Sequence, residues 1–193
     1  MLYLVRHGET EYNAERRIQG RLDLPLNEKG RAQAAALGRS IISLGLSFDA
    51  VYSSTLSRAW ETARIAGARL GLEPKTVPGL EEIFFGRFQG RTFDECARLY
   101  PEAYADWLIN GYGSSMHGGE TGRQIFLRAR AALLTLPEFE KGCALVVCHG
   151  AVIGLLRAAV AGKHLDHVRE LIPKNVQLVE FGPESLRKLM EYR

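Results

Sequence analysis

The stretch of sequence that decides the fold is Met1-Leu2-Tyr3-Leu4-Val5-Arg6-His7-Gly8-Glu9-Thr10-Glu11-Tyr12-Asn13. Its apolar run from Leu2 to Val5 is typical of a buried strand, and it stops abruptly at Arg6-His7-Gly8. Open α/β sheets place their ligand sites at the carboxyl ends of such strands. The hypothesis is that His7 is a nucleophile and that Arg6 helps to hold a phosphoryl group beside it.

Length and composition indicate one ordinary globular domain. The 193 residues fit a single domain over 1–193, which is long enough to bury about 70% of the surface of its unfolded chain. The hydrophobic fraction of 46% and the charged fraction of 24% are those of a water-soluble protein. The net charge of +3 is spread along the chain without a dense Lys/Arg block, so no nucleic acid partner is expected.

Cysteine usage and the apolar runs indicate a cytoplasmic protein. The three cysteines are odd in number and form no pattern with metal-ligand spacing, which favours reduced thiols. No charged and apolar leader pattern precedes the first strand, and no apolar run is long enough to cross a bilayer. We therefore expect a cytoplasmic location and no membrane partner.

The first half of the chain alternates between strand and helix patterns. Asn27 is the expected N-cap of a helix that ends near Gly45, and a second helix is expected to end at Gly71. Strands are expected at 48–52 and 74–77. This alternation predicts an α/β fold, a three-layer α/β/α sandwich around a mostly parallel sheet.

Residues 79–120 interrupt this alternation and are expected to form a partly helical cover over an active site. Thr92 and Glu95 predict a capping box for a helix toward Tyr100, and another helix is expected after Pro101. After the cover, the chain predicts a helix over 125–136, a strand over 144–148 and a helix to about 160. Two final strands, 176–181 and 186–192, are expected to form an antiparallel edge around a Gly-Pro turn.

Two apolar strands end in the same dipeptide. His7-Gly8 follows the first strand, and His149-Gly150 follows the strand over 144–148. If the two strands are parallel in one sheet, both histidines emerge at the same edge. A third strand delivers Ser53-Ser54 and Arg58 to that edge at the start of a helix, where free N–H groups favour an anion.

Five blocks in this order resemble the signature of the histidine phosphatase superfamily, the phosphoglycerate-mutase-like proteins, over essentially the whole chain. The blocks are Leu4-Val5-Arg6-His7-Gly8-Glu9-Thr10-Glu11-Tyr12-Asn13, Ser53-Ser54-x-Leu56-x-Arg58-Ala59-x-x-Thr62-Ala63, Leu80-Glu81-Glu82-Ile83-x-x-Gly86-x-x-x-Gly90, Gly118-Gly119-Glu120-Thr121 and Val146-Val147-Cys148-His149-Gly150. The fourth block has Thr121 where the family usually has serine. The resemblance implies a phosphoglycerate-mutase-like fold.

The resemblance also implies the catalytic roles. His7 would attack phosphorus to form a phosphohistidine, with its other ring nitrogen held by a backbone carbonyl. Arg6, Arg58 and His149 would surround the phosphoryl oxygens and stabilise the charge of the transition state. Glu82 would act first as general acid and then as general base. Glu81 is a rival for that role, but the register of the family block falls on Glu82.

The remaining predicted site residues bind substrate. Asn13 would donate a hydrogen bond to the phosphate. Gly150 is also expected to bind substrate. Gln19 and Gly20, with Arg21 next to them, resemble the loop that lines the substrate pocket of the family. Arg91 and His117 are expected at the surface of the cover, and His164 and His167 have no assigned role.

The predicted function is phosphomonoester hydrolysis of a small phosphorylated metabolite. The acid block Glu82-Ile83-Phe84-Phe85-Gly86 resembles the small phosphatases, among which α-ribazole-5′-phosphate phosphatases and broad-specificity phosphatases are closest. The alternatives are a cofactor-dependent phosphoglycerate mutase, a fructose-2,6-bisphosphatase-type activity and a non-catalytic phosphoester-binding module. The spacing around Cys148 excludes a Cys-x5-Arg phosphatase, and no HExxH or P-loop motif is present, so no metal or organic cofactor is expected. The sequence is compatible with a homodimer.

Overall fold

The computed structural model describes residues 1–166 and 168–192. In these ranges one five-stranded sheet has the order β3-β2-β4-β1-β5. The four strands β1 to β4 are parallel, and β5 pairs antiparallel with β1. The strands are β1 (Leu2–Arg6), β2 (Ala50–Ser53), β3 (Pro74–Thr76), β4 (Ala144–Cys148) and β5 (Leu178–Phe181). The predicted mostly parallel α/β fold is confirmed.

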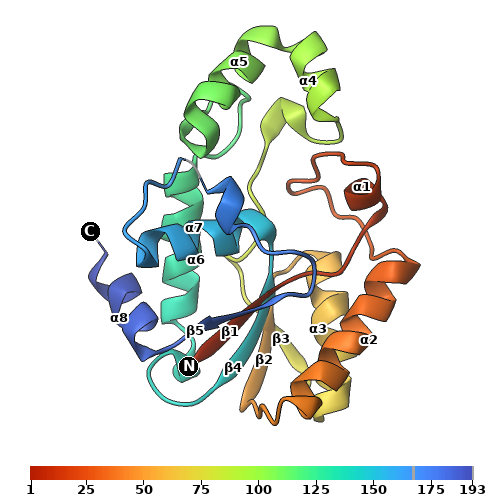
Figure 1. Ribbon diagram of the computed structural model, residues 1–193, viewed down its shortest axis with the longest axis vertical. Helices are drawn as coiled ribbons and strands as arrows, with labels where there is room; N and C mark the ends of the chain where they lie inside the picture. The colour runs from red at the N-terminus through yellow and green to blue at the C-terminus, as the bar shows by residue number, and fades with distance from the viewer. Residues whose placement is uncertain (167, 193) are drawn as a thin grey trace.

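Helices cover both faces of the sheet (Figure 1). One face carries α2 (Glu28–Ser43) and α3 (Ser57–Leu70). The opposite face carries α6 (Gly122–Leu134), α7 (Gly150–Val160) and α8 (Pro183–Glu191). Side chains along β1 alternate between two apolar cores, because Leu2 and Leu4 pack toward α6 and α7 and Val5 packs toward α2 and α3. This gives the predicted three layers.

The ends of the two helices on the first face follow from local chemistry. Asn27 caps α2, since its Oδ1 accepts a hydrogen bond of 2.8 Å from the backbone N–H of Gly30. Gly71 ends α3 in the left-handed conformation at φ 71°. Both boundaries were predicted from the sequence.

The cover lies beyond the end of the sheet at which β1 and β4 finish (Figure 1). It contains α4 (Phe93–Leu99) and α5 (Pro101–Asn110), flanked by the 3-10 turns η1 (Gly86–Phe88) and η2 (Gly111–Gly113). The predicted capping box is present, because Thr92 and Glu95 exchange side-chain-to-backbone hydrogen bonds of 3.1 and 2.8 Å. The cover is therefore partly helical, as the sequence predicted.

One expectation for local structure was wrong. Residues 186–192 are not a strand, because α8 occupies 183–191 and buries Leu186 and Leu189 at helical spacing. The Gly182-Pro183 pair starts this helix, since proline is favoured at a first helical position. The short α1 (Glu11–Ala14) was not predicted. The remaining 3-10 turns are η3 (Pro137–Phe139) and η4 (Arg169–Leu171).

Among the helices of the described ranges, none combines the length and the apolar character that crossing a membrane requires.

Candidate active site

The register of two strands brings the two histidines together. Arg6 on β1 is paired with Cys148 on β4, and the backbone N–H of His7 donates to the Cys148 carbonyl at 3.0 Å. The rings of His7 and His149 are 5.2 Å apart between centroids, and both are almost completely buried. The juxtaposition expected from the two His-Gly strand ends is present.

Gly8 allows the end of β1 to approach α2 closely. A Cβ at this position would lie 2.5 Å from the backbone oxygen of Gly30, which only a glycine avoids. The Gly8 N–H donates to Thr62 Oγ1 on α3 at 3.0 Å. These contacts fix the backbone on which the His7 side chain stands.

Hydrogen bonds define the tautomer of His7. Its Nδ1 lies 2.7 Å from the Gly8 carbonyl oxygen and must donate to it, which leaves Nε2 as the acceptor. Nε2 accepts a hydrogen bond of 3.2 Å from Nε of Arg58. Burial, together with the positive charges of Arg58 and Arg6, lowers the pKa of His7 well below its usual value. Nε2 is therefore unprotonated at neutral pH, and in this structure its lone pair accepts the hydrogen bond from Arg58.

Arg58 is fully buried in the first turn of α3. Its terminal nitrogens donate to the carbonyls of Leu22 at 2.8 Å and Gly20 at 2.7 Å. Burial lowers its pKa to about 10, so the guanidinium stays charged at neutral pH. The 20–22 loop thus holds a cation beside the nucleophilic nitrogen of His7.

Two further buried nitrogens, one on Arg6 and one on His149, have no partner among the described residues. Arg6 donates from one terminal nitrogen to the Pro173 carbonyl at 3.1 Å, but its Nε has no acceptor. His149 contacts Ser54 Oγ through Nε2 at 2.8 Å, while its Nδ1 has none. Burial lowers the pKa of both groups, that of His149 well below its usual value. Unpaired buried polar groups are rare. An anion's oxygen would satisfy the Arg6 Nε–H, and it would satisfy His149 Nδ1 in the tautomer in which that nitrogen carries the proton.

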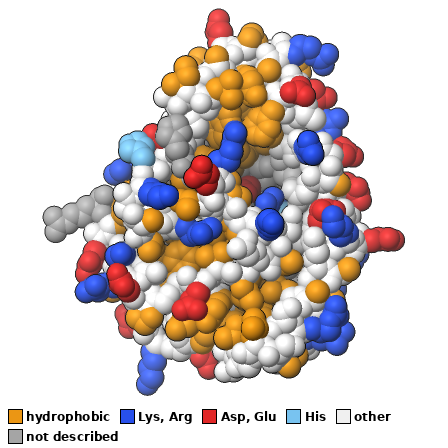
Figure 2. Space-filling view, viewed as in Figure 1, with side chains coloured by type: hydrophobic (Ala, Val, Ile, Leu, Met, Phe, Trp, Pro, Cys, Tyr) orange, Lys and Arg blue, Asp and Glu red, His pale blue; other side chains and the backbone are white. Residues whose placement is uncertain are grey.

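A cleft of about 420 Å³ opens over His7. On the face drawn in Figure 2 the molecule is hollowed below the cover, with Lys and Arg side chains around the hollow. The cleft is lined by Arg6, His7, Tyr12, Asn13, Arg16, Arg17, Ile18, Gln19, Gly20, Arg58, Glu82, Phe85, Phe93, Tyr112, Gly150, Ala151 and Ile172. This lining contains four arginines and one carboxylate, which suits a negatively charged ligand. His149 is not part of the lining and borders the site through its contact with His7.

The geometry separates the two candidate carboxylates. Glu82 lines the cleft, where its oxygens accept from the backbone N–H groups of Ile83 at 3.0 Å and Ala151 at 3.3 Å. Glu81 does not line it and instead accepts from Thr55 Oγ1 and from the Gly79 N–H, both at 2.8 Å. Only Glu82 can therefore reach a ligand in the cleft from this position.

The predicted substrate-binding residues lie in the lining, except for Arg21. Asn13 uses its Oδ1 to cap α1, and its Nδ2 makes no hydrogen bond to the described residues. Gln19 accepts from Thr10 Oγ1 at 2.9 Å. Gly20 adopts φ 55°, and a Cβ there would meet the Gln89 side chain at 2.2 Å. Arg21 is not part of the lining and pairs with Glu120 at 2.8 Å.

The expectation that His117 lies at the surface was wrong. It is fully buried among Phe85, Phe88 and Trp107, with ring centroids 5.5 to 5.8 Å away, and neither ring nitrogen has a partner among the described residues. Arg91 is half-buried against Tyr100. His164 is exposed and pairs with Asp166, whereas His167 lies outside the described residues.

Sequence reasoning missed the segment that closes the site from the far end of the chain. Asn175 donates from Nδ2 to the His7 carbonyl at 2.7 Å, and the Val176 N–H donates to the Arg6 carbonyl at 2.8 Å. The cleft-lining Tyr112, Phe93 and Ile172 were also not predicted. No local pattern marks these residues, because their position depends on packing between distant segments.

Among the described residues, no group of three or more His, Cys, Asp or Glu side chains is arranged to hold a metal ion.

Comparison with known proteins places this site in a family context. The model of the histidine phosphatase superfamily (branch 1) matches residues 2–191. The phosphoglycerate mutase-like protein 4 of Arabidopsis thaliana is 41% identical over 172 residues, which cover 86% of this chain and 74% of that protein.

Solved structures share the fold as well. A putative α-ribazole-5′-P phosphatase from Escherichia coli superposes with a TM-score of 0.79 at 30% identity, covering 90% of this chain and 85% of that one. A mutant phosphoserine phosphatase of Entamoeba histolytica, in complex with phosphoserine, gives a TM-score of 0.78 at 30% identity, covering 92% of this chain and 87% of that one.

Proposed function

The chain belongs to the histidine phosphatase superfamily, and from that premise we propose that it hydrolyses phosphomonoesters of small metabolites through a phosphohistidine at His7. The observation that carries the proposal is the environment of His7 Nε2. This nitrogen is deprotonated, is hydrogen-bonded to a buried guanidinium, and borders a cleft lined by arginines. Phosphoryl transfer needs an unprotonated nucleophile beside positive charge, and the Nε2 lone pair would become free to attack when Arg58 donates to a phosphoryl oxygen instead.

The proposed reaction has two balanced steps. In the first, Nε2 of His7 attacks phosphorus, the bond from phosphorus to the ester oxygen breaks, and Glu82 gives its proton to the departing oxygen. In the second, Glu82 takes a proton from water as the water oxygen attacks phosphorus, and the bond from Nε2 to phosphorus breaks. Arg6, Arg58 and His149 would donate to the phosphoryl oxygens in both steps.

Two features support a phosphatase with an organic, partly apolar leaving group. The structural relatives include proteins described as α-ribazole-5′-P phosphatase and phosphoserine phosphatase. The cleft beyond His7 is walled by Tyr12, Phe85, Phe93 and Tyr112, which suits an aromatic or apolar portion such as that of α-ribazole. A mutase is the second candidate because of the 41% identical phosphoglycerate mutase-like relative. A fructose-2,6-bisphosphatase-type activity and a non-catalytic binding role are weaker alternatives.

A panel of phosphoesters tests the proposed function. Phosphate release should be measured from α-ribazole phosphate, phosphoserine, sugar phosphates, 3-phosphoglycerate and an aryl phosphate, with and without a metal chelator. We expect release from at least one member and no effect of the chelator. Formation of 2-phosphoglycerate primed by 2,3-bisphosphoglycerate, without phosphate release, would favour the mutase. Binding without turnover of any member would favour the binding module.

The acid assignment has its own test. We expect Glu82→Gln to lower kcat by about 100-fold or more, which is the usual contribution of a general acid. Glu81→Gln is the matched control and should change kcat only slightly. The opposite order of the two effects would move the role to Glu81.

A further inference from the structure

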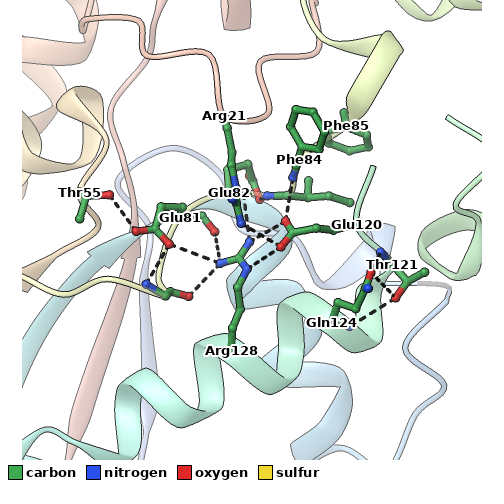
Figure 3. Close-up of polar contacts among 12 residues, drawn as sticks. Arg21, Thr55, Glu81, Glu82, Phe84, Phe85, Glu120, Thr121, Gln124 and Arg128 are labelled. Carbon is green, nitrogen blue, oxygen red and sulfur yellow. Dashed lines mark hydrogen bonds and ion pairs between the residues drawn. The ribbon is translucent and has the colours of Figure 1, made fainter. Parts of the chain in front are cut away.

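Arg128 on α6 is bound at every one of its donors. Its guanidinium carries five N–H groups. Nη1 donates to the carbonyls of Gly79 and Glu81 at 2.8 and 2.7 Å, and Nη2 donates to the Glu82 carbonyl at 3.1 Å. Nη2 and Nε also bind the two carboxylate oxygens of Glu120 at 3.0 and 2.9 Å. Figure 3 shows this guanidinium reaching from α6 into the loop that carries Glu82.

The segment that Arg128 binds has no regular structure of its own. Residues 80–85 belong to neither helix nor strand, so their carbonyls lack the partners that a helix or sheet would provide. Arg128 binds the carbonyl of Glu81 and that of Glu82 itself. The Glu82 carboxylate is then oriented locally by the N–H groups of Ile83 and Ala151. The backbone of the proposed acid is therefore held mainly by Arg128 from α6, and Arg21 adds a longer hydrogen bond of 3.4 Å to the Glu82 carbonyl.

Glu120 connects Arg128 to the loop that carries Glu82 and to the loop that contains Arg21. Its carboxylate accepts from the Phe84 N–H at 2.9 Å and from Arg21 at 2.8 Å, and its own N–H donates to the Phe84 carbonyl at 2.8 Å. Arg21 follows Gly20, whose carbonyl holds Arg58. The two carboxylate oxygens thus join the acid loop, α6 and the Arg58-binding loop (Figure 3).

We propose that Arg128, supported by Glu120, is the positioning residue that sets Glu82 against the leaving oxygen. All five N–H groups of Arg128 are bound within the protein and the residue does not line the cleft, so it acts through Glu82 and not on the substrate. A bidentate guanidinium–carboxylate pair that also binds three carbonyls has a fixed geometry, which a flexible ammonium cannot reproduce. This inference rests on the proposed function, because it concerns the proton transfer assigned to Glu82.

The dependence of rate on the leaving group tests this inference. The leaving group of an aryl phosphate such as p-nitrophenyl phosphate is a stable phenolate anion, which needs little protonation. The leaving group of an alkyl phosphate is an alkoxide, which needs a proton from the acid. We expect Arg128→Ala to lower kcat on the alkyl phosphate by about 10- to 100-fold and to change kcat on the aryl phosphate much less. Arg128→Lys and Glu120→Gln should show the same selectivity, and they give the readout if Arg128→Ala does not fold.

A double variant separates positioning from a general structural effect. If Arg128 acts through Glu82, then Arg128→Ala should add almost nothing to the loss caused by Glu82→Gln. The matched control is Arg130→Ala on the same helix, where Arg130 donates to the carbonyls of Leu189 and Met190 on α8. This control should lower stability without changing the selectivity between aryl and alkyl esters.

Each remaining outcome contradicts a specific statement. Equal losses on the two esters, or additive losses in the double variant, would overturn the role of Arg128. If Glu82→Gln itself shows no selectivity while the wild type is active, the acid assignment fails and takes this inference with it. A wild type that turns over no phosphoester would contradict the proposed function instead.

Discussion

At the scale of single residues, burial acts on three histidines in the same direction. It lowers the pKa of His7, His149 and His117, in the first two cases with further lowering by Arg58. For His117 the nearby Asp106 opposes this effect and Arg87 adds to it. All three side chains are therefore expected to be neutral in the folded protein at neutral pH.

The pH dependence of stability follows from this. An unfolded histidine has a pKa of about 6.5, so below that pH the unfolded chain binds protons that the folded chain excludes. The stabilisation is fully present above about pH 6.5 and is lost as the pH falls below it. We expect the free energy of unfolding, measured in urea without a phosphate ligand, to fall between about pH 6.5 and 5. A constant value over that range would contradict the buried, neutral state.

His117 offers the sharpest variant of this experiment. Leucine has a similar volume and removes two unpaired nitrogens from an apolar pocket. His117→Leu should be neutral or stabilising at about pH 7 and more clearly stabilising at about pH 5.5. The expectation from sequence failed at His117 because its aromatic neighbours come from other segments of the cover.

At the scale of elements, helix caps decide where the functional side chains stand. Thr121 caps α6 in a reciprocal capping box with Gln124, and α6 carries Arg128 two turns later. We expect Thr121→Ala to lower the free energy of unfolding by about 1 kcal/mol, because a capping hydrogen bond is lost. Thr121→Ser should retain most of the stability. Equal losses in the two variants, measured by urea denaturation, would show that the cap has no role.

The predictability of the elements depended on their length and on local signals. The helix capped at Asn27 was predicted because a capping residue and an apolar period coincide there, and the helix after Thr92 was predicted from its capping box. The nine-residue α8 was mistaken for a strand because it shows only two buried leucines. The four-residue α1 has a capping box closed by Asn13 in place of Glu or Gln, so its signal is weak.

At the scale of the whole molecule, parallel strands bring distant residues to one edge. His7, Arg58 and His149 could be brought together from the sequence because each follows a recognisable strand. The 172–177 segment could not, since it reaches His7 by loop packing without a periodic pattern. The cover over 79–120 was predicted from its break in the strand–helix alternation, but which of its aromatic side chains line the cleft, such as Phe93 and Tyr112, depends on tertiary packing.

An anion that binds the arginine-lined cleft is expected to stabilise the folded protein. An anion that binds the folded site and is present at about 100 times its Kd stabilises by about 2.7 kcal/mol. We expect inorganic phosphate to raise the Tm of the wild type more than chloride at equal ionic strength. Arg6→Gln should lose most of the increment, since it removes the positive charge and the unpaired buried Nε–H of Arg6. An unchanged increment in this variant would place the binding elsewhere.

The central claim is that Nε2 of His7 carries the phosphoryl group, and trapping the phosphoenzyme tests it most directly. The wild type and Glu82→Gln should be mixed with a labelled aryl phosphate, quenched in alkali, and digested for mass spectrometry. We predict an acid-labile, alkali-stable phosphoryl group on His7, which accumulates further in Glu82→Gln because hydrolysis is slowed. The same label in His7→Ala, or a phosphoryl group mapped to another residue of the wild type, would contradict the account.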